Sequence, residues 1–189
     1  MENWKYLEIP NYDIIRNKLE KIIQKYKHLL KHGVLIINRE TPELVADITM
    51  IEELMDFLEN KKWLRYVHEY SLVVIEPNKE YGIHIDGNAI APYISRHRVL
   101  LPVTLNEGVY TRFWKTNGEP CKIHYVSADG VKQELLEYDK RICEEIDRYE
   151  LTKPVVMDSI VPHSVDTNFY PSIRIAIGIN FNRNINIEK

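Results

Sequence analysis

The sequence predicts a mainly β protein with N-terminal helices packed outside a jelly roll or barrel. Two observations support this fold class. Apolar residues recur at helical spacing chiefly in the first third of the chain. From residue 65 onward, short segments rich in β-forming residues follow one another with turn residues between them. Because helices and strands do not alternate there, a parallel α/β sheet is a poor fit.

The first 64 residues read as a helical support for the rest of the chain. A helix is predicted over residues 13–30, followed by a short buried strand over residues 33–37. A second helix is predicted to start after Thr41, because Pro42 is well placed in a first helical turn. Its apolar face would comprise Leu44, Val45, Ile48, Ile51, Leu54, Met55 and Leu58.

The remainder, residues 65–183, reads as the β core. Strands are predicted over residues 70–75, 81–86, 98–105, 109–114, 121–126, 154–158 and 172–181. The charged segment 131–150 interrupts them and is predicted to be helical, with an apolar side of Leu136, Ile142, Ile146 and Tyr149. We therefore expect a single domain over residues 1–189, with an insertion at 115–153 that helps to shape the entrance of a pocket.

The composition is that of an ordinary globular protein. Of 189 residues, 44% are hydrophobic and 28% are charged, and the formal net charge is −3. No basic, aromatic-rich stripe is apparent, so we expect no nucleic-acid partner. The N-terminus lacks the layout of a signal peptide, and no apolar run is long enough for a membrane span. We expect a cytoplasmic protein without a membrane partner; the oligomeric state cannot be read from the sequence.

Three separated residues form a candidate metal site. His84 and Asp86 are alternate residues of a predicted strand, so their side chains face the same side. His163 follows another strand, in a turn-like stretch next to Pro162. Two histidines and one carboxylate make up the facial triad of non-haem Fe(II) oxygenases, which leaves the opposite face of the ion open. A structural zinc site would normally use four protein ligands.

Arg174 is the candidate anchor for a carboxylate. It lies eleven positions after His163, in a strongly β-forming strand. It shares one face of that strand with Ala176, Gly178 and Asn180, which suggests a cavity with room for a ligand. A guanidinium in such a place can meet a carboxylate with two parallel hydrogen bonds. The alternative is an arginine on the solvent side of a half-exposed strand.

Together these residues resemble the Fe(II)/2-oxoglutarate-dependent dioxygenase superfamily, in which HxD…H binds iron and a later basic residue binds the far carboxylate of 2-oxoglutarate. The segment 76–87 looks like the approach strand of prolyl-4-hydroxylase-like members. The segment 95–103 looks like the second core strand of the aspartyl/asparaginyl β-hydroxylase-like branch. The resemblance covers residues 70–181 and implies a double-stranded β-helix core, the cupin-like jelly roll.

The resemblance also implies the activity. Fe(II) would be held by His84, Asp86 and His163, and Arg174 would anchor 2-oxoglutarate. Arg98 would lie near the co-substrate carboxylate next to the iron. The enzyme would use O₂ to oxidise, usually to hydroxylate, an amino-acid, peptide or small-metabolite substrate, with release of succinate and CO₂.

Two residues depart from the family pattern, and two more are candidate substrate contacts. Ile75 stands where prolyl hydroxylases often have a tyrosine. Ala176 replaces a serine that many members have two residues after the arginine, which removes one hydrogen bond to the co-substrate. Tyr110 and Arg112 alternate on a predicted strand that could edge the cavity, so they are candidate substrate residues.

Two other functions fit the same residues. A cupin-type metal enzyme would use the same barrel without 2-oxoglutarate, although the HxHxE-like string usual there is absent. A non-catalytic binding protein on an oxygenase scaffold is the other alternative, and the intact set of ligands argues against it. Metal analysis together with a succinate-release assay would separate the three.

Overall fold

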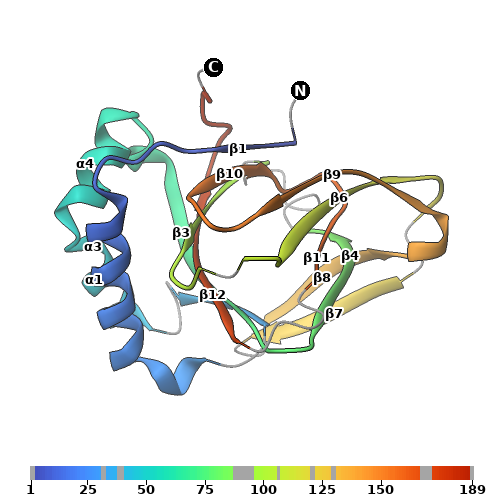
Figure 1. Cartoon of the computed structure of the whole chain (residues 1–189), viewed down its shortest axis with the longest axis horizontal. Coiled ribbons are helices and arrows are strands. Elements are labelled where there is room, and N and C mark those ends of the chain that lie inside the picture. Colours follow the sequence, from blue (N-terminus) through green and yellow to red (C-terminus); the bar gives the residue numbers. More distant parts are fainter. Residues whose placement is uncertain are drawn as a thin grey trace.

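A computed structural model describes residues 3–30, 33–37, 41–86, 96–105, 107–119, 122–128, 131–166 and 172–187. Within these ranges, two antiparallel six-stranded sheets face each other, and helices cover the outside of one of them (Figure 1). The mainly β fold with N-terminal helices that the sequence predicts is confirmed.

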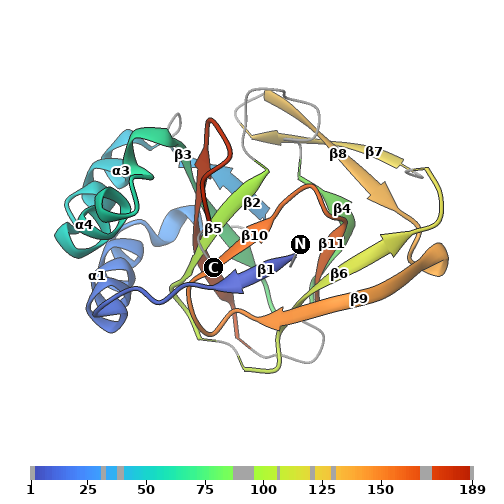
Figure 2. The same cartoon turned by 90° about the horizontal axis from the view of Figure 1, so that it is seen from above.

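Sheet A contains the strand that carries Arg174. Its strand order is β1-β10-β5-β12-β3-β2. The bounds are β1 Trp4–Tyr6, β10 Val155–Asp158, β5 His97–Pro102, β12 Arg174–Phe181, β3 Val67–Ile75 and β2 Gly33–Ile36. Two of these strands, β1 and β2, come from the first 64 residues and form the two edges of the sheet (Figure 2).

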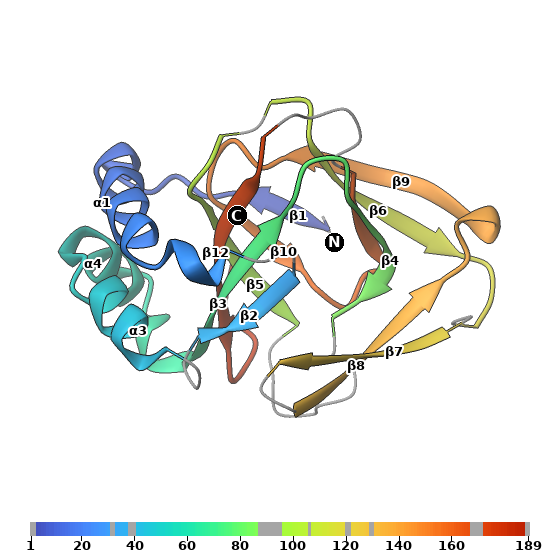
Figure 3. The same ribbon diagram turned by 90° about the horizontal axis from the view of Figure 1, so that it is seen from below.

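Sheet B carries the candidate metal ligands. Its strand order is β7-β8-β4-β11-β6-β9. The bounds are β7 Lys122–Ala128, β8 Val131–Tyr138, β4 Glu80–Ile85, β11 His163–Asp166, β6 Tyr110–Thr116 and β9 Cys143–Glu150. The pair β7 and β8 extends the sheet beyond β4, on the side away from β11 (Figure 3).

The helices lie where the sequence places them but are shorter than predicted. The bounds are α1 Tyr12–Lys25, α3 Pro42–Thr49 and α4 Glu52–Asn60, with 3₁₀ turns at Lys27–Leu29, Leu64–Tyr66 and Lys140–Ile142. The second predicted helix is two helices, because the chain leaves helical geometry at Ile51, whose ψ is 94°. Ile51 nevertheless stays buried, which explains why the apolar pattern runs through the break.

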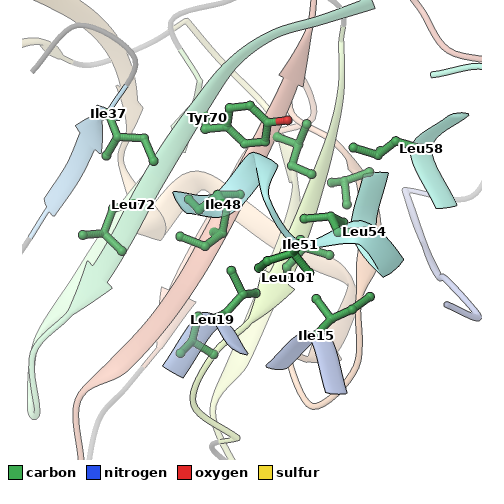
Figure 4. Close-up of a cluster of buried hydrophobic side chains, with 14 of the residues drawn as sticks. Ile15, Leu19, Ile37, Ile48, Ile51, Leu54, Leu58, Tyr70, Leu72 and Leu101 are labelled. Atoms are coloured by element: carbon green, nitrogen blue, oxygen red, sulfur yellow. The ribbon is translucent and has the colours of Figure 1, made fainter. Parts of the chain in front are cut away.

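The helices pack on the outer face of sheet A through one apolar cluster. Ile15 and Leu19 of α1 and Leu54 of α4 are fully buried there against Leu72 of β3 and Leu101 of β5 (Figure 4). Full burial of one such side chain stabilises a fold by about 1.5–3 kcal/mol relative to exposure. This cluster supports one face of sheet A. The other face of sheet A is turned toward sheet B.

Strand β12 separates the two environments. Ile175, Ile177 and Ile179 pack with the helices, whereas Ala176 belongs to a second cluster between the sheets. All eight residues of β12 are buried, so the predicted alternation is between two interior faces rather than between interior and solvent. The face that carries Arg174 therefore points into the molecule, and the solvent-facing alternative for this arginine is wrong.

The prediction of a helix over residues 131–150 is wrong. The structure has strand β8, the 3₁₀ turn at 140–142 and strand β9 there. Strand β9 pairs with β6 along its whole length and lies at the edge of sheet B, with most of its side chains partly or fully exposed. A strand solvated on both faces carries no period-two pattern, so its charged residues resembled a helix face. In the described part of the chain, no helix is long and apolar enough to cross a membrane.

Candidate metal centre

The three candidate ligands meet between strands β4 and β11. His84 of β4 and His163 of β11 are directly opposite each other in the antiparallel register, so their side chains share one face. Asp86 follows β4 by one residue. One donor atom from each of the three residues lies within 4.8 Å of the others. Asp86 Oδ1 is 3.7 Å from His84 Nε2 and 3.8 Å from His163 Nε2.

Both imidazoles are oriented in the same way. His84 Nδ1 lies 2.7 Å from the carbonyl oxygen of Gly82, and His163 Nδ1 lies 2.9 Å from that of Val161. Each Nδ1–H therefore donates to the backbone two residues earlier, which leaves the lone pair of Nε2 for a metal ion. The two rings lie 4.6 Å apart between centroids, close enough to share one ion.

The charge states suit cation binding. Burial alone would raise the pKa of the Asp86 carboxyl, but nearby Arg98, His163 and His84 outweigh it and lower that pKa below its usual value. Burial and the neighbouring His84 lower the pKa of His163 to about 4. At neutral pH the site thus presents a carboxylate and a neutral imidazole from His163, the forms in which these groups bind metals.

A backbone network fixes the turn that carries Asp86. The Asp86 amide donates to the carbonyl of Ser159 at 3.1 Å, and the Ser159 amide donates to the carbonyl of Arg96 at 2.7 Å. The Arg96 side chain in turn forms a partly buried ion pair with Asp158, its Nε donating at 2.8 Å. The link between β10 and β11 therefore holds the aspartate beside the two histidines.

Arg174 lies in the same cavity as the three ligands. That cavity is lined by Val73, Ile75, His84, Asp86, Arg98, Leu100, Thr111, Leu151, Met157, His163, Val165, Arg174 and Ala176. Arg174 is 4% exposed, and its Nη2 donates to Thr111 Oγ1 at 3.2 Å. Its Nε and Nη1 are buried and have no hydrogen-bond partner among the described residues. Burial lowers its pKa from the ordinary value.

Arg98 lines the cavity too, but its guanidinium faces Asp86, a candidate metal ligand. Its Nη1 donates to Asp86 Oδ2 at 3.2 Å, and its Nη2 donates to Ser71 Oγ at 2.5 Å. The sequence resemblance places this arginine near the co-substrate carboxylate. The structure puts it beside Asp86.

The two candidate substrate residues are not among the described residues that line the cavity. Thr111 lines it, and side chains alternate along a strand, so Tyr110 and Arg112 lie on the other face of β6. Arg112 pairs there with Glu145 at 2.6 Å and with Asp166 at 3.4 Å. The Tyr110 ring is flanked by the guanidinium groups of Arg112 and Arg148. The sequence showed that Tyr110 and Arg112 share one face of this strand, but not which face lines the cavity.

Sequence reasoning did not identify three residues around the arginines. Thr111 accepts from Arg174, and Ser71 accepts from Arg98. The buried Tyr149 of β9 lies beside both Thr111 and Arg174, and its hydroxyl is 3.4 Å from Met157 Sδ. These contacts join strands far apart in the chain, so no local sequence pattern could have revealed them.

Comparison with known proteins identifies the fold. No protein-family model matches this sequence, and no curated protein sequence matches it. Solved structures do match. SnoK, a non-heme alpha-ketoglutarate-dependent carbocyclase from nogalamycin biosynthesis, superposes with a TM-score of 0.58 at 12% identity, over 95% of this chain and 79% of SnoK. The chain has the fold of the 2-oxoglutarate-dependent non-haem iron oxygenases. That shared fold is the double-stranded β-helix, so the predicted jelly-roll core is confirmed.

Two further oxygenase-fold structures agree with this assignment. A Pseudomonas putida prolyl-4-hydroxylase matches with a TM-score of 0.51 at 14% identity, over 97% of this chain and 94% of the hydroxylase. The epimerase SnoN, solved with Fe³⁺, alpha-ketoglutarate and nogalamycin RO, matches with a TM-score of 0.58 at 9% identity, over 96% of this chain and 79% of SnoN. No branch of the oxygenase fold is singled out by these matches.

The residues present fit iron and alpha-ketoglutarate, two of the groups bound in the SnoN structure. Two imidazole nitrogens and one carboxylate oxygen converge from one side, which is the donor set of a facial triad with open positions. Two nitrogens of buried Arg174, which have no partner in the described part of the chain, lie in the same cavity and fit a carboxylate. A closed structural zinc site would need a fourth ligand, and among the described residues none joins this cluster.

Proposed function

We propose that this protein is an Fe(II)- and 2-oxoglutarate-dependent oxygenase. His84, Asp86 and His163 hold the iron, and Arg174 binds the carboxylate of 2-oxoglutarate farthest from it. When bound, the iron and co-substrate supply the oxidising chemistry, with succinate and CO₂ as products. The proposed substrate is an amino acid, a peptide or a small metabolite, and hydroxylation is the reaction we expect.

The observation that carries this proposal is the environment of Arg174. A buried guanidinium with unmet donors is costly unless a ligand completes it. The cavity that it shares with the three metal ligands is otherwise lined largely by apolar side chains. A dicarboxylate that reached from the metal to Arg174 would satisfy both ends of this cavity. A cupin-type enzyme without 2-oxoglutarate would have no use for the arginine.

The surrounding side chains have defined tasks in this proposal. Thr111 fixes the Arg174 guanidinium through Nη2, and Tyr149 backs Thr111 from β9. Val73, Leu100 and Ala176 exclude water from the co-substrate, which strengthens the ionic contact at Arg174.

The test is a comparison of iron binding and succinate formation. Iron-loaded protein is incubated with 2-oxoglutarate, O₂ and the small-molecule fraction of a cell extract, and succinate is measured by mass spectrometry. We expect succinate from the wild type and none above background from His163→Ala. If the wild type binds iron yet forms no more succinate than this variant, the cupin-type alternative is favoured. If it binds no iron, a non-catalytic scaffold is favoured.

A further inference from the structure

The two carboxylate oxygens of Asp86 have different neighbours. Oδ1 faces the two histidines, at 3.7 Å from His84 Nε2 and 3.8 Å from His163 Nε2. Oδ2 points to Arg98, whose Nη1 lies 3.2 Å away. The side chains of Asp86 and Arg98 are 15% and 9% exposed, so bulk water competes little for this contact. One oxygen is thus directed to the metal position and the other is held by a cation.

Arg98 contacts Asp86 from the opposite sheet, where residues of neighbouring strands position its side chain. It starts on β5, and its Nη2 donates to Ser71 on β3. Strand β12 lies between these two strands (Figure 3). Because the side chain of Arg98 reaches Ser71, it must cross over β12. The crossing point is Gly178, which is directly opposite Ser71 in the register.

Gly178 leaves room for this crossing. A Cβ atom at position 178 would fall 2.8 Å from both Nε and Nη2 of Arg98, and closer still to Ser71 Oγ. These distances are shorter than real Cβ atoms show, and the three nearest atoms all belong to the Arg98 and Ser71 side chains. A side chain as small as alanine would therefore displace the guanidinium or the serine.

From this geometry we propose that Arg98 is a positioning residue for the metal ligand Asp86, and that Ser71 and Gly178 form its seat. The pair holds Oδ2 away from the ion, so that Asp86 binds through Oδ1 alone and the co-substrate and O₂ keep their positions. This inference rests on the proposed iron site. It assigns Arg98 to the ligand, whereas the sequence resemblance assigns it to the co-substrate carboxylate.

The charge of Arg98 and its position have opposite effects on metal affinity. A guanidinium close to a divalent ion repels it, so its charge alone weakens binding. Fixing a ligand in its binding orientation strengthens binding, and loss of such a partner typically weakens metal affinity about 10–100-fold. Variants that keep the charge but disturb the seat isolate the positioning effect. Ser71→Ala and Gly178→Ala are such variants, since neither changes a charge or a ligand.

The experiment measures the dissociation constant of Mn²⁺ by calorimetry, without 2-oxoglutarate. We expect Gly178→Ala to weaken binding about tenfold or more, and Ser71→Ala about threefold or more. Arg98→Lys should weaken it as well, because one ammonium group lacks the fork that contacts Ser71 and Asp86 together. Gly118→Ala is the matched control, since its Cβ would meet only the end of the Ile142 side chain at 3.2 Å.

Each result has a distinct meaning. Thermal unfolding of the metal-free variants shows whether they fold. If Gly178→Ala does not fold, the Mn²⁺ affinity of Ser71→Ala tests the inference instead. Unchanged Mn²⁺ affinity in Ser71→Ala and Arg98→Lys would overturn the inference. In a second titration, of the Mn²⁺-loaded variants with 2-oxoglutarate, a loss confined to 2-oxoglutarate affinity would assign Arg98 to the co-substrate instead. Absence of Mn²⁺ binding by the wild type would refute the proposed function and not this inference alone.

Discussion

Replacement of Arg174 by methionine tests the proposed co-substrate anchor. Methionine keeps much of the volume of the side chain, so it limits cavity formation, but it removes the charge and all donors. Arg174 is 4% exposed, and its guanidinium has only Thr111 as a hydrogen-bond partner among the described residues. In the metal-bound protein we expect the variant to lose most of its affinity for 2-oxoglutarate.

The magnitude follows from the burial of the contact. Truncating one partner of a buried, hydrogen-bonded charge pair costs about 2–5 kcal/mol of binding free energy. A value of about 3 kcal/mol corresponds to an increase of about 100-fold in the dissociation constant. Without ligand the effect is different. Because the buried charge has few partners, its removal should leave the free energy of unfolding unchanged or slightly higher.

The assay is calorimetric titration of the Mn²⁺-loaded protein with 2-oxoglutarate. Arg112→Met is the matched control, since this arginine lies on the other face of β6 and pairs with Glu145 and Asp166. We expect the control to bind 2-oxoglutarate like the wild type, and both variants to bind Mn²⁺ normally. Equal affinity of the Arg174→Met variant and the control for 2-oxoglutarate would refute the anchor.

Four further outcomes are expected. His84→Ala should lose Mn²⁺ binding by at least about 100-fold, because a three-residue site cannot spare a ligand; calorimetry showing near-normal affinity would exclude this residue as a ligand. Thr111→Val should weaken 2-oxoglutarate binding about 3- to 10-fold through loss of one hydrogen bond to Arg174, with Mn²⁺ affinity unchanged; a parallel loss of both affinities would indicate a structural role instead. Leu54→Ala should lower the free energy of unfolding by about 2–5 kcal/mol in urea titrations yet leave Mn²⁺ affinity intact, since this side chain packs behind sheet A; a metal-binding defect in the folded variant would count against that separation. As the pH falls from 7 to 5, the free energy of unfolding of the metal-free protein should decrease by about 2 kcal/mol. The reason is that His163 takes up a proton near pH 6.5 in the unfolded chain, while burial holds its pKa at about 4 in the folded protein. This decrease should be absent in His163→Asn, and the same pH profile in that variant as in the wild type would contradict the low pKa of His163.

The sequence predicts the fold where a segment has one clear periodicity. Strand β12 is an example, because its alternating isoleucines placed Arg174 on the opposite face from the helix-facing core. The first helix was also predictable, since Ile15 and Leu19 lie one helical turn apart and are fully buried. The break between α3 and α4 was not, because the buried Ile51 continues the apolar pattern through it.

The prediction of a helix over residues 131–150 was wrong because that segment has no clear periodicity. Strand β9 takes its stability from pairing with β6, and most of its side chains are exposed. Backbone hydrogen bonds do not determine which residues occupy exposed positions. The residue types and apolar spacing of this segment therefore favoured a helix. Tyr149, which packs beside Phe113, is the one buried residue of that strand. A single buried residue cannot show a periodicity.

The three candidate metal ligands could be proposed from the sequence, whereas the contacts that orient them could not. His84 and Asp86 are adjacent on one strand face, and His163 completes a known set of ligand types. The roles of Ser71 and Gly178 depend on which strands are neighbours in sheet A. That order is a property of the whole fold, so it becomes visible only in the structure.

The most direct test of the account is a crystal structure of the protein with Mn²⁺ and 2-oxoglutarate. The account predicts one anomalous-scattering peak within bonding distance of His84 Nε2, His163 Nε2 and a single oxygen of Asp86. It also predicts a carboxylate of 2-oxoglutarate in contact with the Arg174 guanidinium. An ion bound elsewhere, or a cavity at Arg174 that stays empty at saturating 2-oxoglutarate, would contradict it.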